Sequence, residues 1–513
     1  IFVDMKKVLL DGEKLTISDA REIVEKELSI GISPAAIKKI KTSRSVVEKW
    51  IKSGEVIYGV TTGFGEFKDV MIPPKDVERL QHNLIISHSA GVGEPLPKNI
   101  VRLMLLLRIN SLVKGYSGVR LELVDQLVKI FNKKITAYIP SQGSVGSSGD
   151  LAPLSHLASV LIGEGYAYDG ADVRPSKAVL AKNRLKPFKL SAKEGLALIN
   201  GTQMMTAFAV EILGRADRLS KLADIAGALS IEAMKGTDVA FSDKLQQVRP
   251  HKGQINTAAN LRRLLKNSEI RLSHIGCGKV QDAYSLRCMP QVHGAVKDTI
   301  EYVNKVILTE VNSATDNPLI FAKSNEHIEG GNFHGEPVAL VMDFLKIALS
   351  ELGNISERRT ARLVDGSLSG LPRFLTSQGG LNSGLMIAQY TAASLVSENK
   401  VLCHPASVDS IPTSANQEDH NSLGSIAARK CFEVLVNTEK ILAIEILCAA
   451  QGIDFLKPLK CGKGTDSAYR QLRKQVTHIE EDVVMSEHIQ SVCDVIFSGV
   501  FVNNVEKSAG KLF

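Results

Sequence analysis

The sequence predicts a mainly α-helical protein dominated by long helices. Apolar residues recur at the helical period in extended stretches, most clearly after residue 203 and again after residue 338. Two further helices are expected at roughly 384–400 and 420–450, whereas the N-terminal part mixes short helices with little strand. We therefore expect a smaller mixed region over residues 5–200 and an elongated bundle of long helices over residues 201–513, together forming one continuous unit.

Composition limits the classes of partner. The chain has 513 residues, of which 44% are hydrophobic and 23% charged, as in ordinary soluble globular proteins. Its net charge is +7, but lysine and arginine are interspersed with acidic residues, which argues against a nucleic-acid-binding surface. The most apolar run, Ile100 to Leu112, is interrupted by Arg102 and Arg108, so it predicts a buried helix and no membrane span.

Cysteine usage points to a reducing compartment. The seven cysteines are an odd number without CxxC pairs or Cys/His clusters, which favours free thiols in the cytoplasm over disulfides or a metal site. No signal peptide is visible, and Met5 followed by two lysines reads like a natural start, preceded here by residues 1–4.

The most informative stretch is Gly- and Ser-rich and spans residues 143–156. At its centre stand Ser147, Ser148 and Gly149. A glycine nitrogen is an unhindered nucleophile, because no Cβ shields it. If a bend brings the Gly149 nitrogen onto the Ser147 carbonyl carbon, a five-membered ring closes. Loss of two waters, one from the Ser148 hydroxyl, then gives a methylidene-imidazolone (MIO), an electrophile made from the backbone.

A helix is predicted directly after this triplet. Asp150 is a plausible N-cap, Pro153 is tolerated in a first turn, and apolar residues follow at helical spacing. The positive end of that helix would stabilise negative charge developing at the ring. Taken alone, the stretch also fits an ordinary loop and cap before a buried helix.

Two candidate stretches lie before the triplet. Tyr58 opens a loop, residues 58–65, that contains three glycines but lacks a phosphate-binding pattern. Residues 81–88 are predicted to be helical and end in His88. On composition alone, a Gly-rich turn and a structural histidine are the simpler interpretations.

Further candidates follow the triplet. Asn200 and Gln203 bracket a glycine just before a long helix. Gln281, Tyr284 and Arg287 are spaced three apart, so they would share one face of a helix. The planar fork of Arg287 suits a carboxylate. The simpler interpretations are a turn leading into a helix and a surface arginine paired with an aspartate.

Together these stretches resemble the aromatic amino acid ammonia-lyases. The resemblance rests on Gly-Ser-Val-Gly-x-Ser-Gly-Asp-Leu-Ala-Pro-Leu-x-His at 143–156 and on similar motifs at 314–319, 330–336 and 408–420. The motifs follow one another in order across almost the whole chain. The family usually has alanine where this chain has Ser147. That side chain lies outside the ring-closing atoms, so we expect the ring to form.

The resemblance implies a fold similar to the fumarase/aspartase-like superfamily. It also implies an MIO electrophile formed from residues 147–149, with no external cofactor. The family forms homotetramers whose active sites take residues from several subunits, and we expect the same assembly here.

The resemblance also implies roles for individual residues. Tyr58 is the expected base, with Glu418 as the competitor, and Tyr284 lies near the ring. His88 and Glu418 would hold an imidazole, and Arg287 a carboxylate. The implied catalytic residues are Tyr58, Ser147, Ser148, Gly149, Tyr284 and Glu418, and the implied substrate-binding residues are His88, Asn200, Gln281, Arg287, Asn317 and Phe333.

The pair Gln417-Glu418 resembles the histidine-specific branch of the family. This implies conversion of L-histidine to trans-urocanate and ammonia, the first step of histidine degradation. One alternative keeps the electrophile in a tyrosine or phenylalanine ammonia-lyase or an aminomutase. The other is a catalytically silent protein whose triplet never closes.

Overall fold

The chain forms two compact units, each assembled from separate segments. The computed structural model describes residues 7–63 and 70–513, so the last two residues of the predicted Tyr58 loop lie outside it. The first unit contains the residues up to Gly214 together with Asn304–Asp343 and Pro405–Arg429. The second contains Arg215–Val303, Phe344–His404 and Lys430–Phe513. The first unit thus combines the predicted N-terminal region with segments from well beyond residue 200.

The strands described in the first unit are short and occur in pairs. One pair is parallel and three are antiparallel, and each contributes local order without forming a larger sheet. The pairs are β1 (Val8–Leu10) with β2 (Ile30–Ile32), β3 (Val92–Pro95) with β4 (Pro140–Gln142), β5 (Tyr166–Asp169) with β6 (Asp172–Pro175), and β7 (Leu319–Phe321) with β8 (Glu326–Ile328).

Helices make up most of the first unit. Helix α4 (Lys98–Val113) is buried from Ile100 onward, as the interrupted apolar run predicted. Among the helices that the structure describes, none is long and apolar enough to cross a membrane. The other helices are α1 (Ile17–Glu25), α2 (Pro34–Ser53), η2 (Pro74–Asp76), α3 (Val77–His88), α5 (Leu121–Asn132), α6 (Leu151–Ile162), α7 (Ser176–Lys182), α8 (Glu194–Ile199) and η5 (Ser414–Asn416).

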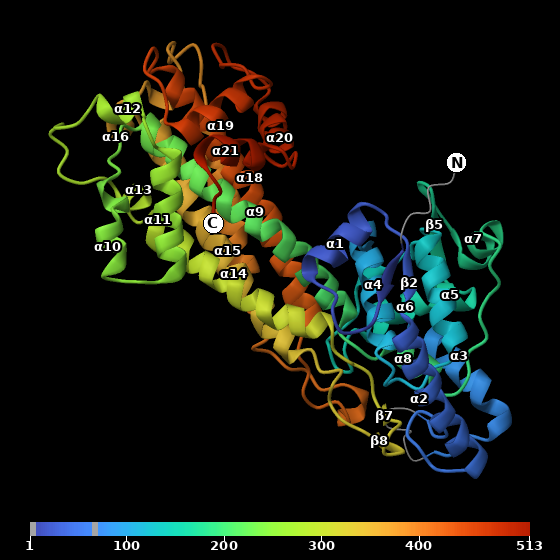
Figure 1. The fold of residues 1–513 in the computed structure, drawn as a ribbon. Helices are drawn as coiled ribbons and strands as arrows, with labels where there is room; N and C mark the ends of the chain where they lie inside the picture. Colours follow the sequence, from blue (N-terminus) through green and yellow to red (C-terminus); the bar gives the residue numbers. More distant parts are fainter. Residues whose placement is uncertain (1–6, 64–69) are drawn as a thin grey trace, which may run out of the picture. The chain divides into compact units, whose positions relative to one another are not determined.

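Four long helices supply much of the second unit, where they lie side by side (Figure 1), and each also has residues in the first unit. They are α9 (Gln203–Ala233), α14 (Met289–Val311), α15 (Glu336–Val364) and α18 (Gly424–Asp454). These helices and α17 (Met386–Leu402) confirm the predicted helical stretches. The mainly α fold is therefore confirmed.

Shorter elements complete the second unit. They connect or cover the long helices (Figure 1). They are η3 (Val239–Phe241), α10 (Asp243–Gln247), α11 (Lys252–Leu264), α12 (Glu269–Leu272), α13 (Tyr284–Arg287), α16 (Gly366–Ser369), η4 (Arg373–Leu375), α19 (Lys463–Arg473), α20 (Met485–Ile496) and α21 (Phe501–Ala509).

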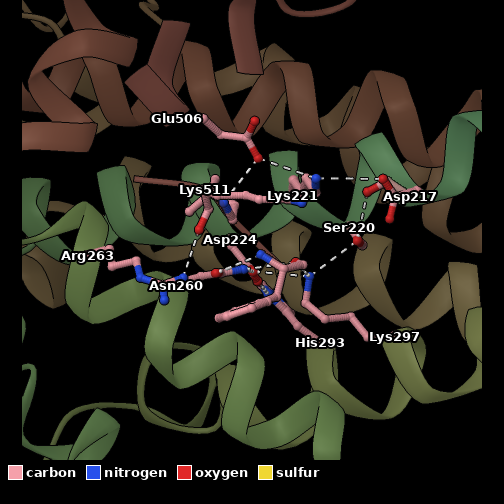
Figure 2. Close-up of polar contacts among 12 residues, drawn as sticks. Asp217, Ser220, Lys221, Asp224, Asn260, Arg263, His293, Lys297, Glu506 and Lys511 are labelled. Atoms are coloured by element: carbon pink, nitrogen blue, oxygen red, sulfur yellow. Dashed lines mark hydrogen bonds and ion pairs between the residues drawn. The ribbon is translucent and has the colours of Figure 1, made fainter. Parts of the chain in front are cut away.

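A buried polar network ties the long helices of the second unit together (Figure 2). Asp224 on α9 accepts a hydrogen bond from Asn260 (2.8 Å), lies 2.8 Å from His293 Nδ1 on α14, and is 3.2 Å from Lys297 Nζ. Burial opposes ionisation of Asp224, but the neighbouring cation and hydrogen-bond donors outweigh it, so its pKa is lowered. Asp224 is thus a buried anion that compensates the charge of Lys297 and accepts hydrogen bonds from its neighbours.

Replacing Asp224 should therefore destabilise the fold strongly. Asp224→Ala leaves Lys297 and His293 buried without their carboxylate, and we expect it to lower the free energy of unfolding by about 3–5 kcal/mol in urea denaturation. Asp217→Ala on the same helix is the control, because Asp217 is 69% exposed and lies 3.8 Å from Lys221. It should cost less than about 1 kcal/mol. Equal losses from the two variants would contradict a structural role for the buried network.

Candidate active site

The triplet lies in a sharply bent backbone that only glycine allows at its third position. Gly146 and Gly149 have φ angles of +71° and +75°, in the left-handed region. A Cβ at Gly149 would lie 2.1 Å from the carbonyl oxygen of Gly201. Any larger residue at position 149 would therefore push the two segments apart.

The close approach at Gly149 is a backbone pairing with Gly201. Gly149 and Gly201 form an isolated parallel bridge, in which the Asp150 N–H donates to Gly201 O (2.7 Å) and the Gly201 N–H donates to Ser148 O (3.4 Å). Both bonds use the neighbours of Gly149, so its own N–H takes no part in this pair. The arrangement fixes the bend and leaves the expected nucleophile out of the pairing.

Asp150 is the N-cap residue of the predicted helix, but its side chain caps a different helix. It makes no side-chain hydrogen bond to α6, the helix that follows it. Instead Asp150 Oδ2 accepts from the backbone N–H groups of Met204 (2.9 Å) and Met205 (3.0 Å), in the first turn of α9. Burial raises the pKa of Asp150 to about 7, against the lowering effect of these two donors. The predicted N-cap position is therefore confirmed, but the side chain serves a helix that begins far along the chain.

The central serine of the triplet contacts Glu418. The Ser148 hydroxyl donates to Glu418 Oε1 (3.1 Å), and the Thr413 hydroxyl donates to Glu418 Oε2 (2.9 Å). Thr413 and Glu418 also pair through their backbones, which braces the loop that carries them. Residues 270 positions apart in sequence thus meet at the predicted ring.

The segment after this loop also holds the triplet stretch. The Ser422 hydroxyl donates to Gly146 O (3.2 Å), the Leu423 N–H donates to Val145 O (2.9 Å), and the Ser425 hydroxyl donates to Ser144 O (2.8 Å). These bonds fix the position of the Glu418 loop relative to residues 144–148.

His88 ends α3 within electrostatic reach of Glu418. Its imidazole is half-buried, and Ser87 Oγ lies 3.0 Å from its Nδ1. Burial lowers the pKa of His88, and the negative charge of Glu418 opposes that shift. A lowered pKa favours a neutral imidazole, which can both donate and accept hydrogen bonds near neutral pH.

Asn200 and Asn317 lie together beside a buried ion pair. Asn200 Nδ2 donates to Asn317 O (3.4 Å), and Asn317 Oδ1 accepts from the Gly330 N–H (2.8 Å). Beside them, Lys193 and Asp316 form an ion pair of 2.6 Å in which both side chains are fully buried. Asn200 Oδ1 is buried without a hydrogen-bond partner among the described residues. A buried amide oxygen in this state needs a hydrogen-bond donor to complete it.

Phe333 and Tyr58 are both half-buried in the same unit. Phe333 precedes His334, whose Nε2 lies 3.2 Å from the backbone oxygen of His420 and whose ring is stacked 5.8 Å from the His420 ring. This contact links the Phe333 loop to the end of the Glu418 loop. Tyr58 lies in a turn after α2, and its neighbour Gly59 is fixed by the Thr62 hydroxyl (3.2 Å).

The remaining predicted residues belong to the second unit. Tyr284 and Arg287 form the two ends of the short helix α13, and the Arg287 guanidinium stacks 4.5 Å from the Tyr284 ring centroid. Gln281 precedes this helix, so the predicted shared helical face includes only the other two residues. Tyr284 is 71% exposed, and Arg287 Nε is buried without a hydrogen-bond partner among the described residues.

Several residues of this site were not singled out from the sequence as site residues. Glu310 accepts a hydrogen bond from the Thr202 hydroxyl, and burial raises the pKa of its carboxyl. Thr413 and Ser422 flank the Glu418 loop and hold it in place. The only signal for the last two was their position beside a recognisable motif. Nothing in the local pattern around Glu310 distinguishes it from a solvated helix residue.

The raised pKa of Asp150 gives a testable pH dependence. A carboxyl with a higher pKa in the folded state binds its proton more tightly when folded. It therefore stabilises the fold below its unfolded pKa of about 4, and that contribution is lost as the pH rises to about 7, amounting to at most about 4 kcal/mol. Asp150→Asn should flatten the fall in unfolding free energy across this range. Urea titrations would compare Ser148→Ala with the Ser148→Ala, Asp150→Asn double variant, because the triplet stays open in both. If the unfolding free energies of the two variants changed with pH in parallel, the raised pKa of Asp150 would be contradicted.

The chain is similar to known proteins over most of its length. Residues 15–474 match the aromatic amino acid lyase family. The chain is 54% identical over 495 residues to a protein named histidine ammonia-lyase from Caldanaerobacter subterraneus subsp. tengcongensis, covering 96% of this chain and 97% of that protein.

Solved structures share the fold. The crystal structure of histidine ammonia-lyase from Trypanosoma cruzi superposes with a TM-score of 0.91 at 46% identity, covering 98% of this chain and 96% of that chain. Tyrosine aminomutase from Streptomyces globisporus superposes with a TM-score of 0.94 at 39% identity, covering 99% and 100%. The fold alone therefore does not separate these activities. The sequence match extends over nearly the whole chain, and the chain is an enzyme of the aromatic amino acid lyase family.

Proposed function

We propose that this enzyme converts L-histidine to trans-urocanate and ammonia through an MIO electrophile formed from Ser147, Ser148 and Gly149. The observation that carries the proposal is the contact of Ser148 with Glu418, the acidic residue of the loop that resembles the histidine-specific branch. The identity of 54% to a protein named histidine ammonia-lyase supports the same substrate.

The backbone around the triplet fits this prosthetic group. The third residue must be glycine, because Gly149 has a positive φ and lies against Gly201. The hydroxyl that must leave belongs to Ser148, which is held by a hydrogen bond to Glu418. The buried Ser147 side chain lies outside the ring-closing atoms, so it does not block closure. The chemistry needs no external cofactor and no metal.

The reaction breaks the Cα–N bond and one Cβ–H bond of the substrate and forms a Cα=Cβ double bond. The electrophile supplies the activation that a poor amine leaving group requires. The protein must also supply a base for the Cβ proton, and we assign Tyr58 to that task, with Glu418 as the competitor. An ordinary tyrosine has a pKa of about 10, so a nearby positive charge must favour its ionised form.

The site holds the substrate ring through polar side chains of the first unit. His88 and Glu418 lie within electrostatic reach of each other, and we assign both to the imidazole. A carboxylate that accepts an imidazole N–H is left unpaired by a phenyl ring, which penalises phenylalanine. We assign Asn200, whose side-chain oxygen has no hydrogen-bond partner among the described residues, to a contact with the substrate or the ring. Asn317 and Phe333 are assigned to the substrate pocket.

The substrate carboxylate is assigned to Arg287, whose planar fork matches it. Tyr284 is placed near the ring, and Gln281 in the substrate pocket. We propose that these three residues act in a homotetramer, where sites combine residues from several copies of the chain. Tyr284 is exposed, and so are large apolar residues on α14, α15 and α17, which supports such an assembly. Those residues are Tyr302, Phe344, Ile347, Ile387 and Tyr390.

The free thiols of the seven cysteines support a cytoplasmic location.

The rival activity is a tyrosine or phenylalanine ammonia-lyase, or an aminomutase, with the same electrophile. The similarity to tyrosine aminomutase is compatible with that rival activity, whereas Glu418 favours histidine as the substrate. A silent protein with an open triplet is the second rival.

The product of the reaction tests the function directly. Purified enzyme is mixed separately with L-histidine, L-tyrosine and L-phenylalanine, and the ultraviolet absorbance of the conjugated acid is followed together with ammonia release. We expect trans-urocanate from L-histidine alone. Product from an aromatic amino acid instead would contradict the assignment of His88 and Glu418, and no product from any of the three would contradict the lyase activity.

The role of Glu418 is tested by ligand selectivity. Glu418→Gln keeps the side-chain shape but removes the charge that accepts the imidazole N–H. We expect it to weaken trans-urocanate binding by roughly tenfold or more, the value of a charge-assisted hydrogen bond, without weakening trans-cinnamate. Calorimetry measures both dissociation constants without turnover, and the exposed neighbour variant Asp419→Asn is the control. Equal weakening of both ligands would remove Glu418 from imidazole recognition.

A further inference from the structure

A buried arginine lies behind the predicted site and has no role in the proposed reaction. Arg108 on α4 is 1% exposed. Its Nη1 donates to the backbone oxygen of Asn200 and to Gln203 Oε1 (2.9 Å). Its Nε and Nη2 are buried without hydrogen-bond partners among the described residues. Both hydrogen bonds from Nη1 therefore end at the junction of α8 and α9, one in the connecting segment and one at the first residue of α9.

The charge of Arg108 is poorly compensated. The carboxylate that acts on it is Asp316, and Asp316 is already paired with the fully buried Lys193 at 2.6 Å. Burial lowers the pKa of Arg108 to about 10, although the Asp316 charge opposes the shift, so the guanidinium stays charged at neutral pH. Two buried cations thus share one anion, an arrangement that costs stability.

The contacts of Arg108 lead directly to the reacting groups. A Cβ at Gly201 would lie 2.5 Å from Arg108 Nη1, so the guanidinium packs against the residue that pairs with Gly149. The backbone oxygen that accepts from Arg108 belongs to Asn200, whose side-chain oxygen has no hydrogen-bond partner within residues 7–63 and 70–513. Gln203, the other acceptor, donates to the Thr315 hydroxyl (2.9 Å) beside Asp316.

We propose that Arg108 is a positioning residue, which holds the Asn200–Gly201 segment so that Gly201 braces the triplet and the Asn200 side chain faces the substrate. A single guanidinium nitrogen, Nη1, donates both to the backbone oxygen of Asn200 and to the side-chain oxygen of Gln203. The inference rests on the proposed function and adds a residue that contacts neither substrate nor ring.

A double-mutant cycle separates positioning from simple stability. We would compare kcat/KM for L-histidine among wild type, Arg108→Gln, Asn200→Ala and the double variant, each divided by the fraction of chains that bear the ring. Arg102→Gln is the matched control, because Arg102 is also buried on α4 and donates to Phe131 O (3.4 Å), away from the segment. Arg108→Lys keeps a charged donor and serves as the milder variant.

We expect Arg108→Gln to lower kcat/KM per ring-bearing chain by about 10- to 100-fold, the value of a hydrogen bond from a charged group. In the Asn200→Ala background the same change should cost less than about threefold, because the side chain that Arg108 orients is absent. Arg108→Lys should lose less than Arg108→Gln. Equal losses in both backgrounds, or an equal loss from Arg102→Gln, would overturn the proposal.

Intact mass provides a readout that does not depend on activity. Arg108→Gln should show a smaller ring-bearing fraction than Arg102→Gln, because Gly201 is no longer held against Gly149. A full ring-bearing fraction would overturn the bracing of the triplet. If Arg108→Gln does not fold, Arg108→Lys takes its place in both measurements. Wild-type activity is measured first. If the proposed function is wrong, the wild type does not convert L-histidine. If only this inference is wrong, the wild type is active and Arg108→Gln does not change kcat/KM or the ring-bearing fraction as predicted.

Discussion

The backbone pairing of Gly149 with Gly201 is the constraint on which the rest of the site depends. The two chain segments approach so closely that a Cβ at position 149 would overlap the backbone of Gly201, and a Cβ at position 201 would overlap the side chains of Gln203, Arg108 and Thr315. The pairing bends the triplet, and Asp150 extends it by capping the helix that follows Gly201. The backbone is thus held in a bent form before any side chain acts, which is what a ring closure between successive residues requires.

Polar groups from distant parts of the chain converge on this pairing. Glu418 reaches Ser148, the serines after the Glu418 loop fix the stretch before the triplet, and Arg108 holds the segment from behind. Buried polar groups of this kind are costly unless each finds a partner. Asn200 Oδ1 has no such partner among the described residues, and only a hydrogen-bond donor could complete it.

The sequence predicted the features that depend on local periodicity. The helices after residues 203 and 338 follow from apolar spacing, which buries one face whatever the rest of the fold does. Features that depend on distant partners were missed or misassigned. Asp150 carries the signal of an N-cap, but nothing local says which helix it serves. Gln281 lies three residues from Tyr284, yet the helix begins only at the tyrosine. Arg108 was seen only as an interruption of an apolar run, because its acceptors lie more than ninety residues away.

The most direct test of this account is the intact mass of the purified chain, measured beside that of the Ser148→Ala variant. Ring closure removes two waters, whereas the alanine variant lacks the hydroxyl that must leave. The account predicts a wild-type chain lighter than its sequence by two waters and a variant at its sequence mass. A wild-type chain at its full sequence mass would contradict it, because the bent backbone at Gly149 would then serve structure alone.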